Sequence, residues 1–244
     1  MNLTISIGNT NIRWAIFEKN ELIRASFFST EAVDYSKFLN SIFKENKIEK
    51  VILCSVVPQA TQKIKRALDF FKKEILILGE NVKVPLKNLY RKKKRLGQDR
   101  LLNAFTAVLY YGTPVVVVDL GTAITFDVVS KNKEFLGGFI LPGLGISLKA
   151  LQENTALLPK LKLKFPSEFI GKDTQQCILS GIIFGFSELI DGLIRRLRKK
   201  MGRNLRVVLT GGDACWICNY LKEKFILDKD LALKGLNFLV DKKD

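Results

Sequence analysis

Residues 115–129 read VVVVDLGTAITFDVV, two apolar runs on either side of the turn Gly121-Thr122. β-Branched residues dominate both runs, and glycine beside a small polar residue is typical of the turn between two strands. Pro114 ends any helix that precedes the first run, because proline lacks the N–H that a helix interior needs. We therefore predict a strand, a glycine turn and a second strand, which together open a new domain.

The start of the chain repeats this arrangement. Ser6-Ile7-Gly8-Asn9-Thr10 leads from one apolar run into another, as Asp119-Leu120-Gly121-Thr122-Ala123 does in the later stretch. A third apolar run follows in both halves, near residues 22–28 and 135–141. Repetition of one supersecondary unit is typical of an internal duplication. The sequence thus favours two domains of similar construction.

Helical spacing alternates with short apolar runs in the rest of the chain. Segments near 35–46 and 58–72 have helical spacing, and the runs 51–54 and 75–78 follow them as buried strands. The remaining predicted elements are a helix over 98–111, a helix after Pro142-Gly143, a long helix over 173–200 and a strand at 207–209. We therefore predict an α/β fold in which helices flank mixed sheets.

The composition suits two folded domains. With 244 residues, of which 47% are hydrophobic, the chain can bury a sizeable core. We place the domains at residues 1–112 and 113–244 and expect a ligand cleft near residues 110–115. No apolar run reaches the roughly 20 residues that a membrane span needs, and four cysteines are too few for a disulfide framework. We expect a cytoplasmic protein without a membrane partner.

Histidine is absent from the sequence, which restricts the chemistry. Proton transfer near neutral pH falls to carboxylates, Lys, Tyr or Cys, and hydrolase triads built on His are excluded. Zinc would need cysteines and carboxylates alone, and only Cys215 and Cys218 have the spacing of a pair. Because no second pair accompanies them, we interpret these two residues as ordinary buried thiols on a helix.

The formal net charge of +16 predicts an anionic partner. The candidates are nucleic acid, an anionic membrane surface and a small anion such as a nucleotide. The basic run from Arg91 to Arg95 is an electrostatic funnel for small anions, a nucleic-acid patch or a solvated loop. No stacking-aromatic motif accompanies it, so nucleic acid is the less favoured partner.

Glycine turns between strands suit the binding of phosphate. Without a side chain in the way, backbone N–H groups approach an anion closely, and a neighbouring hydroxyl adds a donor. Thr10 and Thr122 supply such hydroxyls, and Asp119 supplies a carboxylate for a cation. At a third turn, Gly211-Gly212, small residues at a strand end leave room for an adenosine ring or ribose. Neither a P-loop nor a Rossmann fingerprint occurs, and each turn alone also fits a hairpin that binds nothing.

Five short motifs occur in an order that resembles one enzyme family. They are Gly8-Asn9-Thr10, Gly97-Gln98-Asp99-Arg100, Asp119-Leu120-Gly121-Thr122-Ala123, Gly137-Gly138 to Pro142-Gly143, and Thr210-Gly211-Gly212-Asp213. Together they resemble the type III pantothenate kinases of the actin-like (ribonuclease H-like) and sugar-kinase superfamily. The resemblance implies two actin-like domains with an ATP cleft between them. It also implies ATP-dependent phosphorylation of pantothenate to 4′-phosphopantothenate, the first step of coenzyme A biosynthesis.

The same resemblance implies cofactors and nucleotide contacts. It predicts a homodimer that needs ATP, Mg²⁺ or another divalent cation, and K⁺ or NH4⁺. The implied ATP-binding residues are Ser6, Ile7, Gly8, Asn9, Thr10, Asn11, Ile12, Arg13, Thr122, Gly211 and Gly212. Asp119 is implied to be the ligand of the monovalent cation.

The motif from Gly97 to Arg100 is implied to bind pantothenate. The full set of implied substrate-binding residues is Tyr90, Gly97, Gln98, Asp99, Arg100 and Thr174. Asp99 is implied to be the catalytic base, which suits phosphoryl transfer because a carboxylate can orient the attacking hydroxyl. Arg100 is suited to bidentate pairing with the pantothenate carboxylate. The alternative is that Asp99 only complements the dipole at the start of a helix.

Two residues depart from the pattern of the family that the motifs resemble. Ser6 stands where the first phosphate loop normally begins with an aspartate, and Ala15 replaces a usual glycine. The aspartate helps to hold the divalent metal, and a serine hydroxyl brings no negative charge for that task. The alternative function is therefore that of a catalytically weak or inactive relative with a regulatory or nucleic-acid-binding role.

Overall fold

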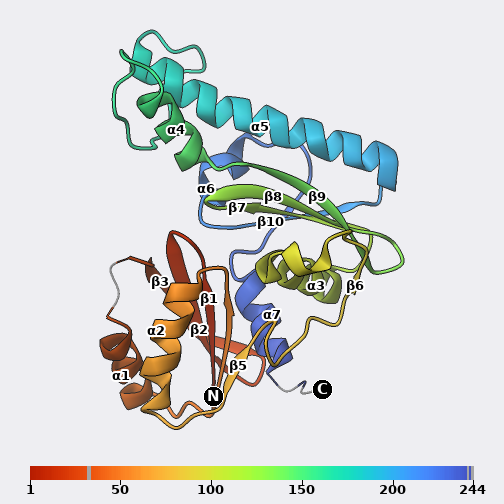
Figure 1. Ribbon diagram of the computed structural model, residues 1–244. Helices are drawn as coiled ribbons and strands as arrows, with labels where there is room; N and C mark the ends of the chain where they lie inside the picture. The colour runs from red at the N-terminus through yellow and green to blue at the C-terminus, as the bar shows by residue number, and fades with distance from the viewer. Residues whose placement is uncertain (32–33, 241, 243–244) are drawn as a thin grey trace. The chain divides into compact units, whose positions relative to one another are not determined.

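The computed structural model describes residues 1–31, 34–240 and 242 and divides into two compact units (Figure 1). Unit 1 consists of Met1–Leu109 together with Asp230–Asp244, and unit 2 of Tyr110–Lys229. The chain thus leaves unit 1 close to the predicted boundary after residue 112. It differs from the predicted division at its end, because the last segment groups with unit 1 and not with the second domain.

Unit 1 is built on a mixed five-stranded sheet. Its strands are β1 (Asn2–Ile7), β2 (Asn11–Glu18), β3 (Glu21–Ser29), β4 (Lys50–Ser55) and β5 (Ile75–Ile77), in the order β3-β2-β1-β4-β5. Strand β2 runs antiparallel to β1 and β3, whereas β4 runs parallel to β1 and β5. The strands predicted in this part of the sequence are confirmed.

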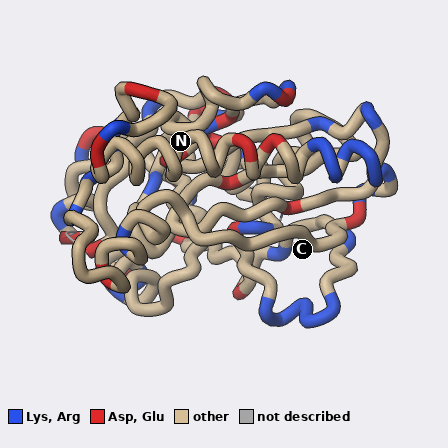
Figure 2. Tube along the Cα trace, turned by 90° about the horizontal axis from the view of Figure 1, so that it is seen from above, with Lys and Arg blue, Asp and Glu red and all other residues tan. Residues whose placement is uncertain are grey.

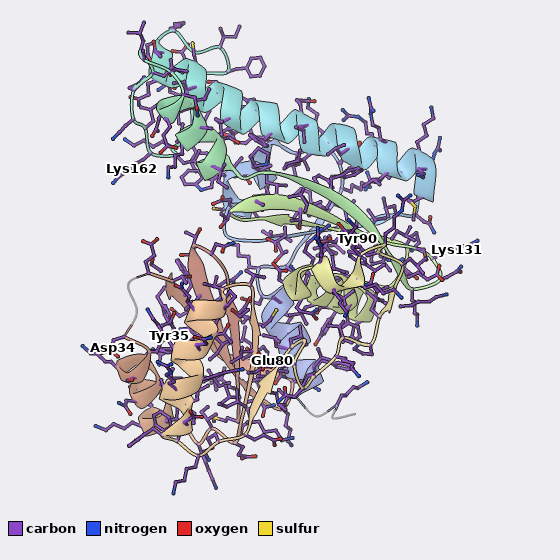
Figure 3. The ribbon with its side chains drawn as sticks, viewed as in Figure 1. Asp34, Tyr35, Glu80, Tyr90, Lys131 and Lys162 are labelled. Carbon is purple, nitrogen blue, oxygen red and sulfur yellow. The ribbon has the colours of Figure 1, made fainter. Side chains whose placement is uncertain are left out.

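Helices pack on both faces of this sheet. Helices α1 (Tyr35–Glu45) and α2 (Pro58–Asp69) share one apolar cluster with β1, β2 and β4. Asp34 caps α1 by accepting a hydrogen bond from the N–H of Lys37 at 3.0 Å, at the helix start that Figure 3 labels. Because side chains alternate along β2, Ala15 and Phe17 point to the opposite face, where they meet Leu233 of α7 (Leu231–Leu239).

Helix α3 (Gln98–Tyr111) completes this layer of unit 1. It packs against α7 so closely that a Cβ on Gly235 would overlap the Thr106 hydroxyl. Between β5 and α3 the chain forms the short strand β6 (Lys87–Asn88) and the 3₁₀ turn η1 (Lys93–Arg95). The α3 boundaries match the predicted helix, whereas β6, η1 and α7 were not predicted.

Unit 2 repeats the strand arrangement of unit 1. Its strands are β7 (Val115–Leu120), β8 (Ala123–Val129), β9 (Glu134–Pro142), β10 (Arg206–Thr210) and β11 (Ile226–Leu227), which follow each other as β11-β10-β7-β8-β9. Strand β8 is antiparallel to β7 and β9, and β10 is parallel to β7 and β11. Read from the opposite edge, the order and directions match those of unit 1, which confirms the predicted duplication.

One face of the second sheet carries the core of unit 2. Even-numbered residues of β7 and β8, such as Val118 and Phe126, are fully buried in one cluster with Ile183 and Ile190 of α5 (Thr174–Met201). The odd-numbered residue Asp119 therefore lies on the other face. The remaining elements of the unit are α4 (Leu144–Glu153), α6 (Ala214–Ile217) and the 3₁₀ turn η2 (Cys218–Tyr220).

Helix α5 is long and apolar enough to cross a membrane by length and composition, with a mean hydropathy of 1.8 over its most apolar window. The helix contains charged residues such as Glu188 and Asp191, so it is not an uninterrupted apolar run of the kind considered in the sequence. A core helix of a soluble protein meets the same criteria, and 44% of that window is buried in the structure. The burial of Ile183 and Ile190 in the core cluster assigns α5 a packing role.

Candidate active site

The first glycine turn joins β1 to β2 and is fixed by backbone contacts. The Gly8 N–H donates to the Asn11 carbonyl at 2.9 Å, and a Cβ on Gly8 would lie 3.1 Å from that oxygen. Thr30 braces the turn from outside, because its hydroxyl donates to the Gly8 carbonyl at 2.8 Å and its N–H to the Thr10 carbonyl at 2.9 Å. Asn9 and Thr10 are exposed. The turn is therefore rigid and open to a ligand.

The flanking residues of this turn have different roles. Ile7 and Ile12 face each other across the hairpin and are buried, so they shape the turn without offering polar groups. Ser6 pairs with Arg13 in the same register and is half-buried. The Arg13 guanidinium lies 3.0 Å from the Asp230 carboxylate at the start of α7.

Asp99 lies in the first turn of α3, as predicted. Its Oδ1 accepts a hydrogen bond from the Arg100 N–H at 2.9 Å. The carboxylate folds back over Gly97, where a Cβ would overlap Oδ1, so a larger residue there would displace the Asp99 side chain. Burial raises the pKa of Asp99 above its usual range, although the Arg100 N–H and the Arg100 charge act in the lowering direction. A carboxylate with a raised pKa is a stronger base than an exposed one.

Cys54 connects Asp99 with the first glycine turn. In the parallel pairing of β1 and β4, Cys54 stands beside Ser6. Burial raises the pKa of the Cys54 thiol, and the charge of Asp99 adds to that rise. The charge of Asp99 therefore acts on Cys54, the residue of β4 that pairs with Ser6. The sequence did not indicate this proximity, which depends on the pairing of β1 with β4.

The other predicted substrate residues of unit 1 differ in burial and in their local contacts. The side chain of Gln98 rests against Gly79, whose φ of +85° favours glycine, and a Cβ on Gly79 would lie 2.9 Å from Gln98 Cγ. Arg100 is buried. Tyr90 is half-buried on the segment between β6 and η1 (Figure 3), where its N–H donates to the Asn88 side chain at 2.8 Å.

In unit 2, Gly211 brings the second and third turns together. Its φ is +93°, and a Cβ there would overlap the Leu120 carbonyl and lie 2.5 Å from Asp119 Oδ1. The Asp213 N–H donates to the Leu120 carbonyl at 2.9 Å. The structure thus places the predicted cation ligand Asp119 directly beside the predicted adenosine turn, two features that are far apart in the sequence.

Thr122 is exposed at the tip of the β7–β8 turn. The Gly121 N–H donates to the Ala123 carbonyl at 3.1 Å, and the Gly143 N–H donates to the Thr122 carbonyl at the same distance. A Cβ on Gly143 would overlap the Gly121 carbonyl and lie 2.5 Å from that of Thr122. The turn and the start of α4 therefore lie in close contact, and this contact requires glycine at position 143, whereas a Cβ on Gly121 would make only ordinary contacts at 3.8 Å.

A second carboxylate lies on the same sheet face as Asp119. Asp119 pairs with Thr125, and the Thr125 hydroxyl donates to Asp127 Oδ2 at 3.1 Å. Asp127 is fully buried. Within residues 1–31, 34–240 and 242, no group of three or more acidic or cysteine side chains forms a ready-made metal site. A cation at Asp119 would need carbonyl, water or nucleotide oxygens as further ligands, and hard cations accept such ligands.

Thr174 is the one predicted site residue of unit 2 that lies apart from these turns. It is exposed at the start of α5 and lines a cavity of about 660 Å³ with Leu151, Leu158 and Cys177. Helix α4 begins beside the Thr122 turn and reaches the cavity only near its other end, at Leu151. The structure therefore does not bring Thr174 to the phosphate turn of its own unit.

The basic run from Arg91 to Arg95 is exposed, with its last three residues in η1. The chain has 40 Lys and Arg against 24 Asp and Glu, and Figure 2 shows consecutive basic stretches along the Cα trace. The exposure of the run from Arg91 to Arg95 agrees with all three interpretations of it, so its role stays a prediction.

Comparison with known proteins decides the family. Residues 2–196 match the sequence model of the type III pantothenate kinases. The chain belongs to this family. A type III pantothenate kinase of Sulfurihydrogenibium sp. is 37% identical over 249 residues, which cover 98% of this chain and 99% of the relative. One from Finegoldia magna is 38% identical over 252 residues, 98% of this chain and 96% of the relative.

The solved structures show the fold of this type III pantothenate kinase. A ROK family glucokinase from Streptomyces griseus, solved with glucose and AMPPNP, matches with a TM-score of 0.53 at 10% identity, over 98% of both chains. At such low identity the likeness shows the fold alone, that of the actin-like ATPases and sugar kinases. The predictions of family, fold class and kinase activity are confirmed. The regulatory or nucleic-acid-binding alternative finds no support.

Proposed function

We propose that this protein transfers the γ-phosphoryl group of ATP to the 4′-hydroxyl of pantothenate in the cytoplasm, giving ADP and 4′-phosphopantothenate. Family membership supports a kinase that uses ATP and a divalent cation. The single observation that carries the chemistry is the position of Asp99. It is a half-buried carboxylate of raised pKa in the first turn of α3, and its charge acts on Cys54, which pairs with Ser6 of β1.

In this proposal Asp99 is the base. Its Oδ1 is held by the Arg100 N–H, so Oδ2 is the oxygen that accepts the proton of the substrate hydroxyl. Arg100 pairs with the pantothenate carboxylate, and Tyr90, Gly97 and Gln98 complete the substrate contacts of unit 1. A coupled assay with ATP, Mg²⁺, K⁺ and a panel of hydroxylated carboxylic acids tests the assignment. Pantothenate should be the preferred acceptor, and equal turnover of unrelated hydroxy acids would contradict it.

The nucleotide contacts in this proposal come from the three turns. The exposed backbone at Gly8 to Asn11 and the hydroxyl of Thr122 bind phosphate oxygens, while Gly211 and Gly212 leave room for the adenosine. A divalent cation such as Mg²⁺, when bound, would supply positive charge to neutralise the charge that develops on the transferred group. The two units act as the two domains of the enzyme.

A homodimer is part of the same proposal. Beside the cavity that Thr174 lines, Leu157, Phe169 and Ile170 are exposed by 93%, 73% and 75%. Large apolar residues gathered on a surface often mark a protein–protein contact. In the proposed dimer Thr174 serves as a substrate contact from this surface, which explains why it lies apart from the phosphate turn of its own unit.

Asp119→Ala should weaken the response of activity to K⁺ or NH4⁺. The Asp119 carboxylate lies against Gly211 at the second turn, so a monovalent ion there would lie beside the bound phosphates. Activity of the variant and the parent protein is measured at rising KCl, with NaCl at the same ionic strength as the control. Identical responses to K⁺ in the two proteins would remove Asp119 from this role.

Ser6→Asp should raise turnover at limiting Mg²⁺ more than at saturating Mg²⁺. Ser6 pairs with Cys54, on which the charge of Asp99 acts, and a carboxylate at position 6 adds a ligand oxygen for the divalent ion. Ser6→Asn is the matched control, since it has the same shape without the charge. Turnover is measured across a Mg²⁺ series with KM for pantothenate expected to stay the same. The metal placement is wrong if the parent protein already equals the aspartate variant at every concentration.

A further inference from the structure

Two thiols follow the adenosine turn on one short helical segment. Cys215 is exposed on α6 and Cys218 is half-buried at the start of η2, and both are free. Ala214 and Ile217 occupy the buried side of this segment, three residues apart. The interpretation of both cysteines as buried thiols is therefore wrong for Cys215, because α6 has only one turn and its inner face is already filled.

The backbone holds the two sulfur atoms on neighbouring positions of one turn. Residues three apart on a helix place their Cβ atoms about 5–6 Å apart, whereas a disulfide needs about 3.5–4.5 Å. The chain tightens from α6 into the 3₁₀ turn η2 at Cys218, whose Sγ lies 3.9 Å from the Cys215 carbonyl. A shift of about one ångström therefore suffices to join them.

The Cys215 thiol also touches the adenosine turn. It donates to the Gly212 carbonyl at a sulfur–oxygen distance of 3.4 Å. A disulfide has no S–H group, so oxidation of Cys215 removes this donor and pulls its sulfur toward Cys218. Oxidation of Cys215 is consequently expected to alter the backbone position of the Gly211-Gly212 turn.

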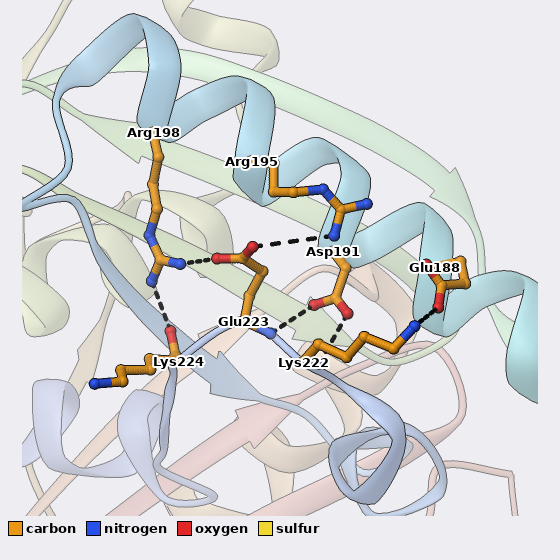
Figure 4. A network of polar contacts seen from close by, with 7 residues as sticks. All are labelled: Glu188, Asp191, Arg195, Arg198, Lys222, Glu223 and Lys224. Atoms are coloured by element: carbon orange, nitrogen blue, oxygen red, sulfur yellow. Dashed lines mark hydrogen bonds and ion pairs between the residues drawn. The ribbon is translucent and has the colours of Figure 1, made fainter.

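The far end of the segment is fixed to α5, as Figure 4 shows. The fully buried Asp191 carboxylate accepts hydrogen bonds from the N–H groups of Lys222 at 2.8 Å and Glu223 at 3.1 Å. Arg198 forms an ion pair with Glu223 and donates to the Lys224 carbonyl at 2.9 Å. These contacts oppose a displacement of residues 222–224 when residues 215–218 move.

On the other side, Gly211 is fixed against Asp119 and Leu120, but Gly212 has room. A Cβ on Gly212 would meet no atom within 4 Å, and the residue is exposed. Tightening of the Cys215–Cys218 turn is therefore expected to displace Gly212 first.

We propose that Cys215 and Cys218 form a redox-active dithiol that exchanges with low-molecular-weight disulfides such as glutathione disulfide, and that its oxidation displaces the Gly211-Gly212 turn. The exposed Cys215 attacks the small disulfide as a thiolate, its S–S bond breaks and one small thiol leaves. Cys218 then attacks Cys215 Sγ, which forms the internal disulfide and releases the second small thiol. Two electrons pass to the small disulfide, and two protons end on the released thiols.

A reducing compartment agrees with this role. Disulfides in the cytosol are usually transient and serve in catalysis or redox sensing, so the dithiol is the resting form there. The effect of oxidation on ATP rests on the proposed function, in which Gly211 and Gly212 bind the adenosine. The exchange chemistry itself does not depend on it.

The first experiment uses the full-length protein and follows thiols and backbone without any nucleotide. After incubation with glutathione disulfide, we expect the loss of two thiols, a mass lower by two hydrogens and one peptide that contains the Cys215–Cys218 bond. Amide hydrogen exchange should change at residues 210–213. Persistent mixed disulfide, two unreacted thiols or unchanged exchange at the turn would overturn the proposal.

Matched variants assign the sulfur atoms. Cys177→Ser removes the other exposed thiol, which lies on α5, and should leave the internal disulfide intact. Cys218→Ser should stop at a stable mixed disulfide on Cys215, because the resolving thiol is missing. An internal disulfide that disappears in Cys177→Ser, or forms in Cys218→Ser, would contradict the assignment.

A second experiment tests the link to nucleotide. We expect oxidation to weaken ADP binding by about ten-fold, and dithiothreitol to restore it. Equal ADP affinity of the oxidised and reduced forms would overturn the coupling. If neither form binds ADP, the proposed function fails. Disulfide formation and amide hydrogen exchange at the Gly211-Gly212 turn then still test the dithiol proposal, because neither measurement uses a nucleotide.

Discussion

Asp99→Asn is expected to lower turnover by about 100-fold or more, the usual scale for a positioned general base. The asparagine keeps the shape of the side chain and a carbonyl oxygen that can accept from the Arg100 N–H. It has no basic oxygen for the substrate proton. ADP binding should stay within about two-fold of the parent protein, because Asp99 is not among the proposed nucleotide contacts.

The pH profile separates a base from a structural carboxylate. In the parent protein kcat/KM should rise with pH as Asp99 loses its proton, and burial moves this rise above the pH range of an exposed aspartate. This rise of kcat/KM with pH should be absent from Asp99→Asn. Asp99→Glu is the rescue variant and should restore part of the rise of kcat/KM with pH. A rate unchanged by Asp99→Asn would remove this residue from catalysis.

Gly211→Ala is expected to cause the second large effect. The new Cβ would overlap the Leu120 carbonyl and approach Asp119 Oδ1 to 2.5 Å, at a φ of +93° that alanine rarely adopts. The Leu120 carbonyl belongs to the backbone of β7, so it cannot rotate away as the Asp119 side chain can. We expect a loss of about 2 kcal/mol or more in the free energy of unfolding and a melting temperature lower by roughly 4–8 °C.

Gly212→Ala is the matched control for this substitution, one residue further along. Its Cβ would meet no atom within 4 Å, and its φ lies outside the left-handed region. Calorimetry should therefore give a melting temperature close to that of the parent protein. ADP affinity should fall by at least about ten-fold in Gly211→Ala, because the displaced turn also moves Asp119. Equal melting temperatures for the two alanine variants would show that the Gly211 turn relaxes without cost.

Local patterns predicted most of the fold. The strand–glycine–strand repeats at Gly8 and Gly121 led to two similar units, and the matching strand orders bear this out. Helix α7 was missed because its role is to cover the far face of a sheet built from the other end of the chain. Its apolar residues, such as Leu233, pack against Ala15 and Phe17 of β2, a contact that cannot be recognised from the sequence of the helix alone.

The candidate site was predictable as a set of residues but not as an arrangement. Motif order pointed to Asp99 and Asp119, because their neighbours in sequence carry the family pattern. The pairing of Ser6 with Cys54, on which the charge of Asp99 acts, arises from strand pairing, and the approach of Gly211 to Asp119 arises from the packing of a glycine against a strand end. Neither relation produces a periodic pattern of residues that could be recognised in a single sequence. For the same reason the exposure of Cys215 followed only from the short length of α6.

The return of the chain to unit 1 has a consequence for synthesis on the ribosome. Unit 2 is complete once Lys229 has emerged, whereas unit 1 still lacks α7 at that moment. The late segment is tied in by several contacts, among them Asn237 with the Asn2 side chain at 3.0 Å and with the Lys19 carbonyl at 2.7 Å. The half that is translated first is thus the half that finishes folding last. A nascent chain stalled before Asp230 would expose the apolar face around Phe17, the surface on which a chaperone would act.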